Sequence, residues 1–132
     1  MGSLSNKQIG SAFERTLCQK LANLGYWVHF LAPDARGAQP FDIIAVKHGV
    51  AHAIDCKTCV AATFNISRLE ENQILAFEHW LRCGNTTPII AVLHEGRIYA
   101  IEYDRLKEQR SIKLNTETER TQFFWDDERS DT

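Results

Sequence analysis

The chain has 132 residues, with 15 Lys and Arg against 17 Asp and Glu, so its formal net charge is −2. That length fits one domain, and no apolar run approaches the roughly 18 residues of a membrane span. The N-terminus lacks the apolar core of a signal peptide, so we expect an intracellular, cytoplasmic protein. The net acidity argues at first against a nucleic-acid-binding domain, because such domains are usually basic.

The first half of the chain predicts one helix and three strands. Apolar residues recur at helical spacing up to Gly25, which is a stop signal, and aromatic and β-branched runs that favour strands follow it. The expected elements are a helix at residues 6–24, a strand at 26–32, a turn-rich connector at 33–40, and strands at 41–46 and 50–57.

The second half adds another amphipathic helix, two strands and a short helix. These are expected at residues 68–83, 87–94, 97–101 and 103–109, after an irregular stretch at 58–67. The order of elements predicts an α/β domain with a central mixed sheet flanked by helices. We place this domain at residues 1–110, and a polar, acidic C-terminal tail at 111–132.

The cysteines are expected to be free thiols, because a domain of this size buries enough surface without disulfides. Cys56 and Cys59 form a lone CxxC without a second pair downstream, so zinc is only a minor alternative. The five histidines are scattered without metal-ligand spacing, which favours structural or surface roles.

A two-residue turn at His48-Gly49 would place Asp42 directly opposite Asp55 in a hairpin. Side chains opposed in this way point to the same face, with Cβ atoms about 4.5–5.5 Å apart. Lys57 shares that face roughly 6.8 Å further along the strand. A three-residue turn would shift this register by one. The residues expected to point the other way, into a core, are Phe41, Ile43, Ile54 and Cys56.

Two opposed carboxylates repel each other, and a divalent cation is the simplest compensation. Carboxylate and water oxygens suit Mg²⁺, while Lys57 could act on a water or stabilise charge on a phosphate. The alternative is an ion pair between Lys57 and one aspartate at a solvated sheet edge. Charged residues inside apolar strands are costly, however, and this weighs toward a functional site.

Glu14 lies at the border of the apolar stripe of the first helix. It is either a boundary glutamate with its head in water or a helix ion pair, or else a further carboxylate that reaches the same site. Both interpretations stay open from the residues alone.

The segments GSAFERTL, PFDIIAV, AIDCK and NQILAFEHW together resemble the PD-(D/E)xK nuclease superfamily. Within it, the resemblance is to Holliday-junction resolvases of the archaeal and RecU-type groups, and it covers residues 9–103. It implies a restriction-endonuclease-like core. The residues that match the motif are Glu14 for the helix glutamate, Asp42 within Pro40-Phe41-Asp42, and Asp55 and Lys57 for the (D/E)xK pair.

This resemblance implies an Mg²⁺-dependent, structure-selective DNA endonuclease that hydrolyses phosphodiester bonds in branched or four-way DNA. Asp42, Asp55 and Glu14 would hold the metal, for which Mn²⁺ is expected to substitute, and Lys57 would act on the water or the transition state. Gln73 resembles a glutamine that many members place near the site. A homodimer is also implied, because two strands must be cut symmetrically.

The charge is distributed unevenly along the chain. Residues 1–101 contain nine basic and eight acidic residues, whereas 102–132 contain six basic and nine acidic ones, so DNA binding is not excluded. The expected DNA contacts are Arg36, Gln39, Arg68 and Gln73. The alternatives are another nuclease of the superfamily, of restriction or repair type, a non-catalytic DNA-binding protein of the same fold, or a small interaction module.

Overall fold

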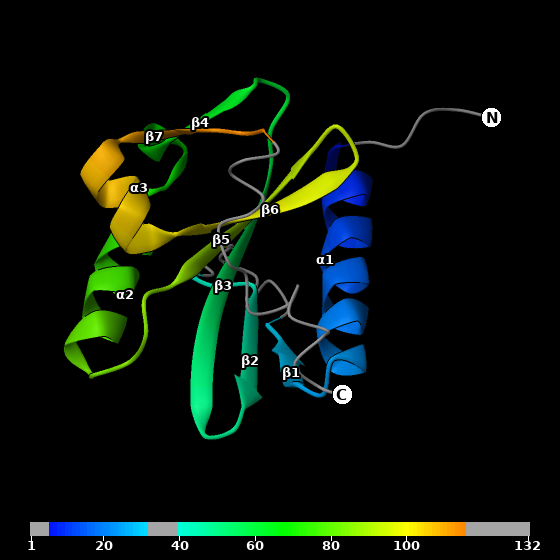
Figure 1. Cartoon of the computed structure of the whole chain (residues 1–132), viewed down its shortest axis with the longest axis vertical. Helices are drawn as coiled ribbons and strands as arrows, with labels where there is room; N and C mark the ends of the chain where they lie inside the picture. The colour runs from blue at the N-terminus through cyan, green and yellow to red at the C-terminus, as the bar shows by residue number, and fades with distance from the viewer. Residues whose placement is uncertain (1–5, 32–39, 116–132) are drawn as a thin grey trace.

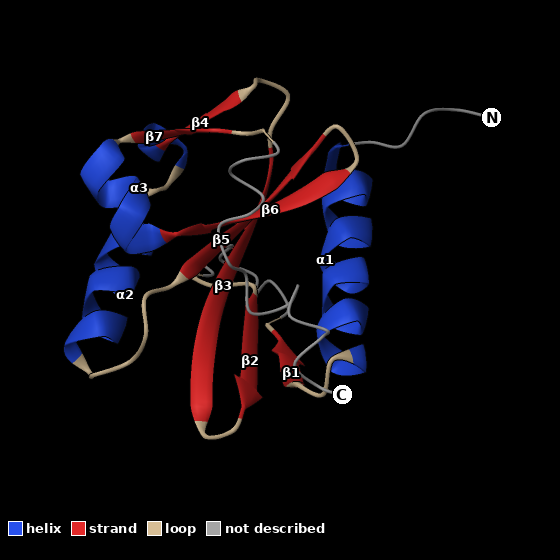
Figure 2. Cartoon of the chain, in the orientation of Figure 1, coloured by secondary structure: helices blue, strands red, loops and turns tan. Residues whose placement is uncertain are grey.

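The computed structural model describes residues 6–31 and 40–115, and the side chains from Ala12 onward within them. A five-stranded sheet lies between helix α1 on one face and helices α2 and α3 on the other (Figures 1 and 2). The predicted α/β class, with a mixed sheet flanked by helices, is confirmed.

The elements follow the predicted order, with some additions. They are α1 (Asn6–Asn23), β1 (Trp27–Phe30), β2 (Ile43–Lys47), β3 (Val50–Thr58), β4 (Thr63–Asn65), the 3-10 helix η1 (Ile66–Arg68), α2 (Glu71–Arg82), β5 (Ile89–His94), β6 (Arg97–Glu102), α3 (Tyr103–Gln109) and β7 (Ser111–Lys113). The main sheet has the order β1-β2-β3-β5-β6, in which β3 and β5 are parallel and the other pairs antiparallel. Helix α2 lies in the crossover between the two parallel strands, as such a connection requires.

The hairpin of β2 and β3 has the predicted two-residue turn. His48 and Gly49 both have positive φ, at 53° and 77°, and Lys47 pairs with Val50. Two positive φ values are typical of the type I′ turn, whose twist matches that of the flanking strands. The register is therefore fixed along β2 as far as Ile43, which pairs with Ile54.

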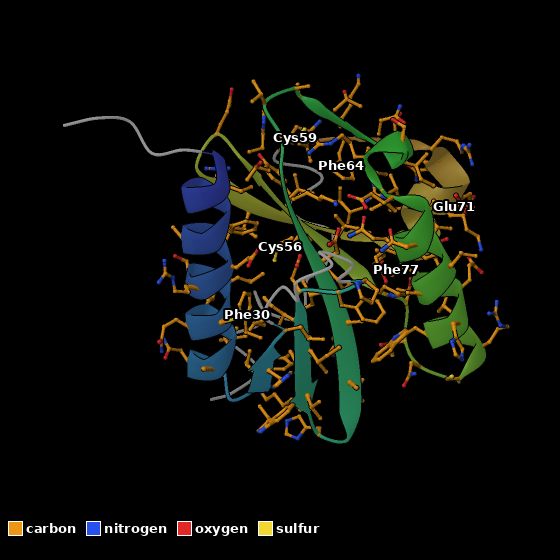
Figure 3. All side chains as sticks on the ribbon, turned by 180° about the vertical axis from the view of Figure 1, so that it is seen from behind. Phe30, Cys56, Cys59, Phe64, Glu71 and Phe77 are labelled. Carbon is orange, nitrogen blue, oxygen red and sulfur yellow. The ribbon has the colours of Figure 1, made fainter. Side chains whose placement is uncertain are left out.

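A separate apolar core covers each face of the sheet (Figure 3). Under α1, Phe13, Leu17 and Leu21 follow one another at helical spacing and are buried on β-strand residues such as Ile43 and Ile54. Under α2 and α3, the buried residues include Phe64, Phe77, Ile90, Val92, Ile101, Tyr103 and Leu106. Both faces of the central strands are thus covered, and any polar side chain on them needs a partner.

A second, two-stranded sheet pairs β4 with β7. The stretch at 58–67, which is expected to be irregular, contains strand β4 and the first two residues of the 3-10 helix η1. The strand was not predicted, because three residues are too few for a periodic pattern. Strand β7 begins one residue after the predicted end of the domain at 110, and Ile112 and Leu114 are buried. Residues 116–132 of the predicted tail lie outside the described residues.

The four cysteines, Cys18, Cys56, Cys59 and Cys83, are free, as predicted. Within residues 6–31 and 40–115, no helix is long and apolar enough to cross a membrane.

Candidate active site

The chain departs from regular pairing just before β2, at Asp42. The Asp42 N–H donates to the carbonyl of Ile54 at 2.9 Å, although Ile54 is already the partner of Ile43. Two successive residues therefore face one residue of β3, which is the arrangement of a β-bulge. The prediction that Asp42 lies directly opposite Asp55 is wrong for this reason, because a bulge interrupts the alternation of side chains.

The same bulge turns Phe41 to the face of the sheet under α2. Its ring stacks on Phe77 with centroids 5.5 Å apart, and meets Trp80 edge-on at 5.5 Å. Phe41 was expected to point with Ile43, Ile54 and Cys56 into one core. Those three contribute to the core under α1, so the prediction is wrong only for Phe41, on the far side of the bulge.

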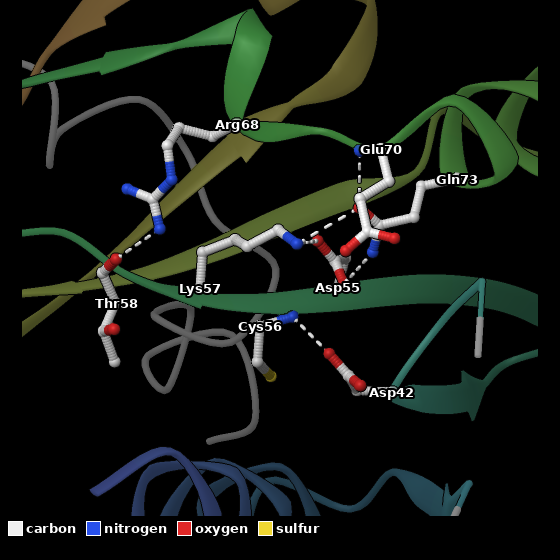
Figure 4. Close-up of polar contacts among 8 residues, drawn as sticks. All are labelled: Asp42, Asp55, Cys56, Lys57, Thr58, Arg68, Glu70 and Gln73. Atoms are coloured by element: carbon white, nitrogen blue, oxygen red, sulfur yellow. Dashed lines mark hydrogen bonds and ion pairs between the residues drawn. The ribbon is translucent and has the colours of Figure 1, made fainter. Parts of the chain in front are cut away.

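The Asp42 carboxylate lies beside β3 (Figure 4). Its Oδ2 accepts a hydrogen bond of 2.7 Å from the Cys56 N–H, taking the place of a backbone carbonyl in the ladder. Backbone N–H groups of a strand point along the plane of the sheet, so this bond holds the carboxylate close to that plane, and not on either face. Asp42 is thereby brought near side chains from both faces.

Asp55 points from β3 to the face under α2, where only 2% of its surface is exposed. Its Oδ1 accepts from Gln73 Nε2 at 2.8 Å. Its Oδ2 lies 3.4 Å from Lys57 Nζ, within ion-pair distance, but has no hydrogen-bond partner and is fully buried. Burial raises the pKa of Asp55, and the Asp42 carboxylate raises it further, while the Lys57 ammonium opposes the rise.

Gln73 connects these side chains to the start of α2 (Figure 4). Its Oε1 accepts from Lys57 Nζ at 3.1 Å and from the Glu70 N–H at 3.0 Å. The second of these bonds satisfies a backbone donor that the helix cannot pair internally, as the glutamine of a capping box does. One buried amide therefore fixes Asp55, Lys57 and the helix N-terminus together.

Glu14 lies on the opposite side of the sheet, half-buried on α1. Burial raises its pKa to about 7, and the Asp42 carboxylate contributes to the rise. The structure thus places Glu14 near Asp42. In residues 6–31 and 40–115, no three His, Cys, Asp or Glu side chains form a group that could hold a metal ion, so Glu14, Asp42 and Asp55 do not make a preformed three-carboxylate cage.

Of the four predicted DNA contacts, the structure describes Arg68 and Gln73. Arg36 and Gln39 lie outside the described residues. Arg68 is exposed, and its Nη2 donates to the Thr58 carbonyl at 2.8 Å, one residue beyond Lys57. Gln73 is only 5% exposed and is bonded to Asp55 and Lys57, so its amide lies among the site residues.

Two contributors to the site were not predicted from the sequence. The N–H groups of Cys56 and Glu70 hold Asp42 and Gln73 in place. Gln73 at the third position of an apolar helix matches half of the capping-box pattern and could have indicated one of them, although Glu70 is not a usual N-cap residue. Cys56 contributes its backbone N–H, which every residue except proline has, so the residue type could not indicate this role.

The donor set fits a hard divalent cation. Asp55 Oδ2 is a buried carboxylate oxygen without a hydrogen-bond partner, and the neighbouring Asp42 adds like charge. A cation would relieve both costs at once. One or two protein carboxylates, completed by water and phosphate oxygens, are the usual protein share of an Mg²⁺ site.

The family model of the archaeal Holliday junction resolvases (Hjc) matches residues 5–123 of the chain. The chain belongs to this family. Among solved structures, Hjc of Archaeoglobus fulgidus, a Holliday junction resolvase from an archaeal hyperthermophile, is similar with a TM-score of 0.59 and 18% identity, over 77% of this chain and 85% of that chain. At that identity the likeness shows the fold. No curated protein sequence matches the chain.

The resemblance inferred from the sequence motifs is therefore confirmed at the level of the family. Membership in the Hjc family assigns the chain to the nucleases that act on DNA junctions in recombination. Resolvases of this kind generally use a divalent metal ion, with which the buried Asp55 and its neighbour Asp42 are compatible.

Proposed function

We propose that this Hjc-family protein is an Mg²⁺-dependent endonuclease that hydrolyses phosphodiester bonds in four-way DNA junctions. One observation carries the proposal. The buried Asp55 has a carboxylate oxygen without a hydrogen-bond partner, 3.4 Å from the ammonium of Lys57. A buried polar atom that accepts no hydrogen bond calls for an explanation, and a carboxylate oxygen that binds a cation when the metal is present provides one.

Asp42 and Asp55 would hold the cation, and Glu14 would assist from the α1 face. When bound, the divalent ion supplies positive charge at the scissile phosphate and lowers the pKa of water. Mn²⁺ is expected to replace Mg²⁺, because both accept carboxylate and water oxygens. The Cys56 N–H keeps Asp42 oriented at 2.7 Å, so this carboxylate needs little rearrangement to bind.

Lys57 would donate a hydrogen bond to the attacking water or to a phosphate oxygen. Its side chain is 17% exposed, and Asp55 and Gln73 hold the ammonium in one place. A fixed cation stabilises the charge that develops on a phosphate in the transition state without reorganising at that moment. Gln73 would act through Asp55 and Lys57 as a positioning residue.

Arg68, with Arg36 and Gln39, would contact the phosphate backbone near the cleaved bond. Arg68 is exposed, and its guanidinium is hydrogen-bonded to the carbonyl of Thr58, the residue that follows Lys57 at the end of β3 (Figure 4). Cutting a four-way junction symmetrically takes two such sites, so we propose a homodimer. Light scattering on the purified protein measures whether its mass in solution is that of one chain or of two.

The decisive experiment is cleavage of a synthetic four-way junction with Mg²⁺ or with EDTA, using Asp55→Asn as the matched inactive variant. We expect Mg²⁺-dependent cleavage of the junction by the native protein only. Cleavage in EDTA, or by Asp55→Asn at the native rate, would overturn the proposal. Equal cleavage of a linear duplex of the same sequence would indicate a restriction- or repair-type nuclease, and binding without cleavage a non-catalytic relative.

A further inference from the structure

The two-stranded ribbon of β4 and β7 has one apolar and one polar face. Phe64 pairs with Ile112, and both are buried in the core beneath α2 and α3. Because side chains alternate along a strand, the flanking pairs project from the opposite side. We call this side the ribbon face; it consists of Thr63, Asn65, Ser111 and Lys113.

The ribbon face carries hydroxyl, amide and ammonium groups. Thr63, Asn65 and Lys113 are exposed, and Ser111 is partly exposed. Such groups make most protein contacts to the sugar-phosphate backbone of DNA, because they donate hydrogen bonds and do not repel phosphate. The ribbon face therefore has the chemistry of a backbone-binding surface.

The segments that form the ribbon and lead into it contain basic but no acidic residues, in a chain that is acidic overall. The segments 57–69 and 110–115 contain no Asp or Glu, although the whole chain has a net charge of −2. Their basic residues are Lys57, Arg68, Arg110 and Lys113. Lys57 is already ion-paired with Asp55, so the basic side chains that these segments add around the ribbon are Arg68, Arg110 and Lys113. Basic side chains in a stretch without Asp or Glu favour contact with a polyanion even where the net charge of the protein does not.

The ribbon is joined rigidly to the candidate active site. The chain leaves β3 directly after Lys57 and Thr58, forms β4 and η1, and returns at Arg68, which donates to the Thr58 carbonyl at 2.8 Å. The Arg68 guanidinium also lies over the Phe64 ring, 5.5 Å from its centroid. The ribbon thus lies beyond the Lys57 end of β3, on the side of the sheet under α2 (Figures 1 and 4).

Backbone bonds beyond the two strands make the ribbon a fixed platform. The Leu114 N–H donates to the Ala62 carbonyl at 2.8 Å, and the Ile66 N–H donates to the Arg110 carbonyl at 2.9 Å. Together they close the ribbon at both ends. A pre-ordered surface loses little conformational entropy when it binds a ligand.

We propose that the ribbon face is a second DNA-backbone site, which binds phosphates of a junction arm some distance from the cleaved bond. This inference rests on the proposed function, because it takes branched DNA as the polyanion. It assigns to Thr63, Ser111 and Lys113 a part in binding that is separate from the chemistry at Asp55 and Lys57. The surface holds the arm by charge and shape, and it reads no base sequence.

The test measures the affinity of the full-length protein for a synthetic four-way junction in EDTA, where cleavage does not interfere, at several salt concentrations. Lys113→Ala is expected to weaken binding about 3- to 10-fold at 0.1 M salt, and to reduce the slope of log K against log salt by about 1. Ser111→Lys, which adds a cation on the same face, is expected to tighten binding. A gain of affinity cannot result from unfolding.

Arg82→Ala is the matched control, since it removes the same charge from the opposite end of α2. It is expected to leave the affinity and the salt slope unchanged. If Lys113→Ala behaves like Arg82→Ala, or if Ser111→Lys does not tighten binding, the ribbon site is wrong while junction cleavage by the native protein stands. If the native protein neither binds nor cuts junctions, both proposals fall.

Discussion

The two faces of the sheet each contribute an acidic side chain, but in different surroundings. Under α2, Asp55 is almost fully buried and is held by Gln73 and Lys57 at fixed distances. Under α1, Glu14 is half-buried at the helix border, and its pKa of about 7 reflects burial and the nearby Asp42. Burial alone does not build a site: of these two side chains, Asp55 combines burial with bonded partners and Glu14 does not.

The largest effects are expected for substitutions of Lys57 and Asp55, and they should differ in sign for the stability of the protein. Both Lys57→Ala and Asp55→Asn should lower junction cleavage, by about 10²–10³-fold for Lys57→Ala. Their effects on the metal-free protein should be opposite. Lys57→Ala leaves a buried carboxylate without its cation and destabilises the fold by about 1–3 kcal/mol, whereas Asp55→Asn removes the buried charge, keeps an acceptor for Gln73 and stabilises it.

Denaturant unfolding in EDTA at pH 8 measures this difference, and its pH dependence is the control. The pKa of Asp55 is higher in the folded protein than in the unfolded protein. Its ionisation therefore lowers the free energy of unfolding as the pH rises from the unfolded pKa to the folded pKa. The gain in unfolding free energy of Asp55→Asn over the native protein should therefore be complete at alkaline pH and vanish near pH 4. An advantage of equal size at both pH values would show that Asp55 is not the strained charge we infer.

Gln73→Ala should have an intermediate effect. It removes the donor to Asp55, the acceptor for Lys57 and the cap of the Glu70 N–H, so we expect cleavage to fall about 10- to 100-fold and stability by about 0.5–2 kcal/mol. Losing the donor favours protonated Asp55, so the pH–rate profile should also move to higher pH.

The neighbouring Asn72→Ala is the control for Gln73, because Asn72 is exposed on the same turn of α2. It should change neither the rate nor the pH profile. A Gln73→Ala enzyme that is merely less stable, with an unmoved pH profile, would reduce Gln73 to a helix cap.

Glu14→Gln should have the smallest effect. The raised pKa of Glu14 means that its charge costs stability from about pH 4.5 upward, fully so above pH 7, and half-exposure limits that cost to less than about 1 kcal/mol. The variant should be slightly more stable than the native protein at pH 8 and equal to it at pH 4, by thermal unfolding. It should slow cleavage about 10-fold, less than Asp55→Asn does. A loss as complete as that of Asp55→Asn would remove the difference between the two faces.

Much of the fold could be predicted because long periodic segments report burial directly. Phe13, Leu17 and Leu21 marked the buried side of α1, and the His48-Gly49 turn set the register as far as Ile43. The predicted register fails at Asp42, because the bulge adds a residue to the strand and no residue type in the sequence indicates a bulge there. Strands β4 and β7 were missed because three residues carry too little pattern, although 111–114 does alternate polar and apolar residues.

The site was predictable where it lies on one regular strand. The i, i+2 spacing placed Asp55 and Lys57 on one face, and their side chains are 3.4 Å apart there. The contacts from other elements depend on tertiary packing. The sequence indicated that Gln73 begins a helix near the site, but not that one of its oxygens bonds Lys57 and the Glu70 N–H together.

That shared oxygen links the site to the local stability of α2. Fraying of the first helical turn and release of Lys57 break bonds to the same atom, so we expect the two openings to be coupled. A ligand that fixes Asp55 and Lys57 should therefore also slow the exchange of amide hydrogens in that turn, with no contact to the helix. Binding of a ligand to the site on β3 should thus be detectable in the amide exchange of α2.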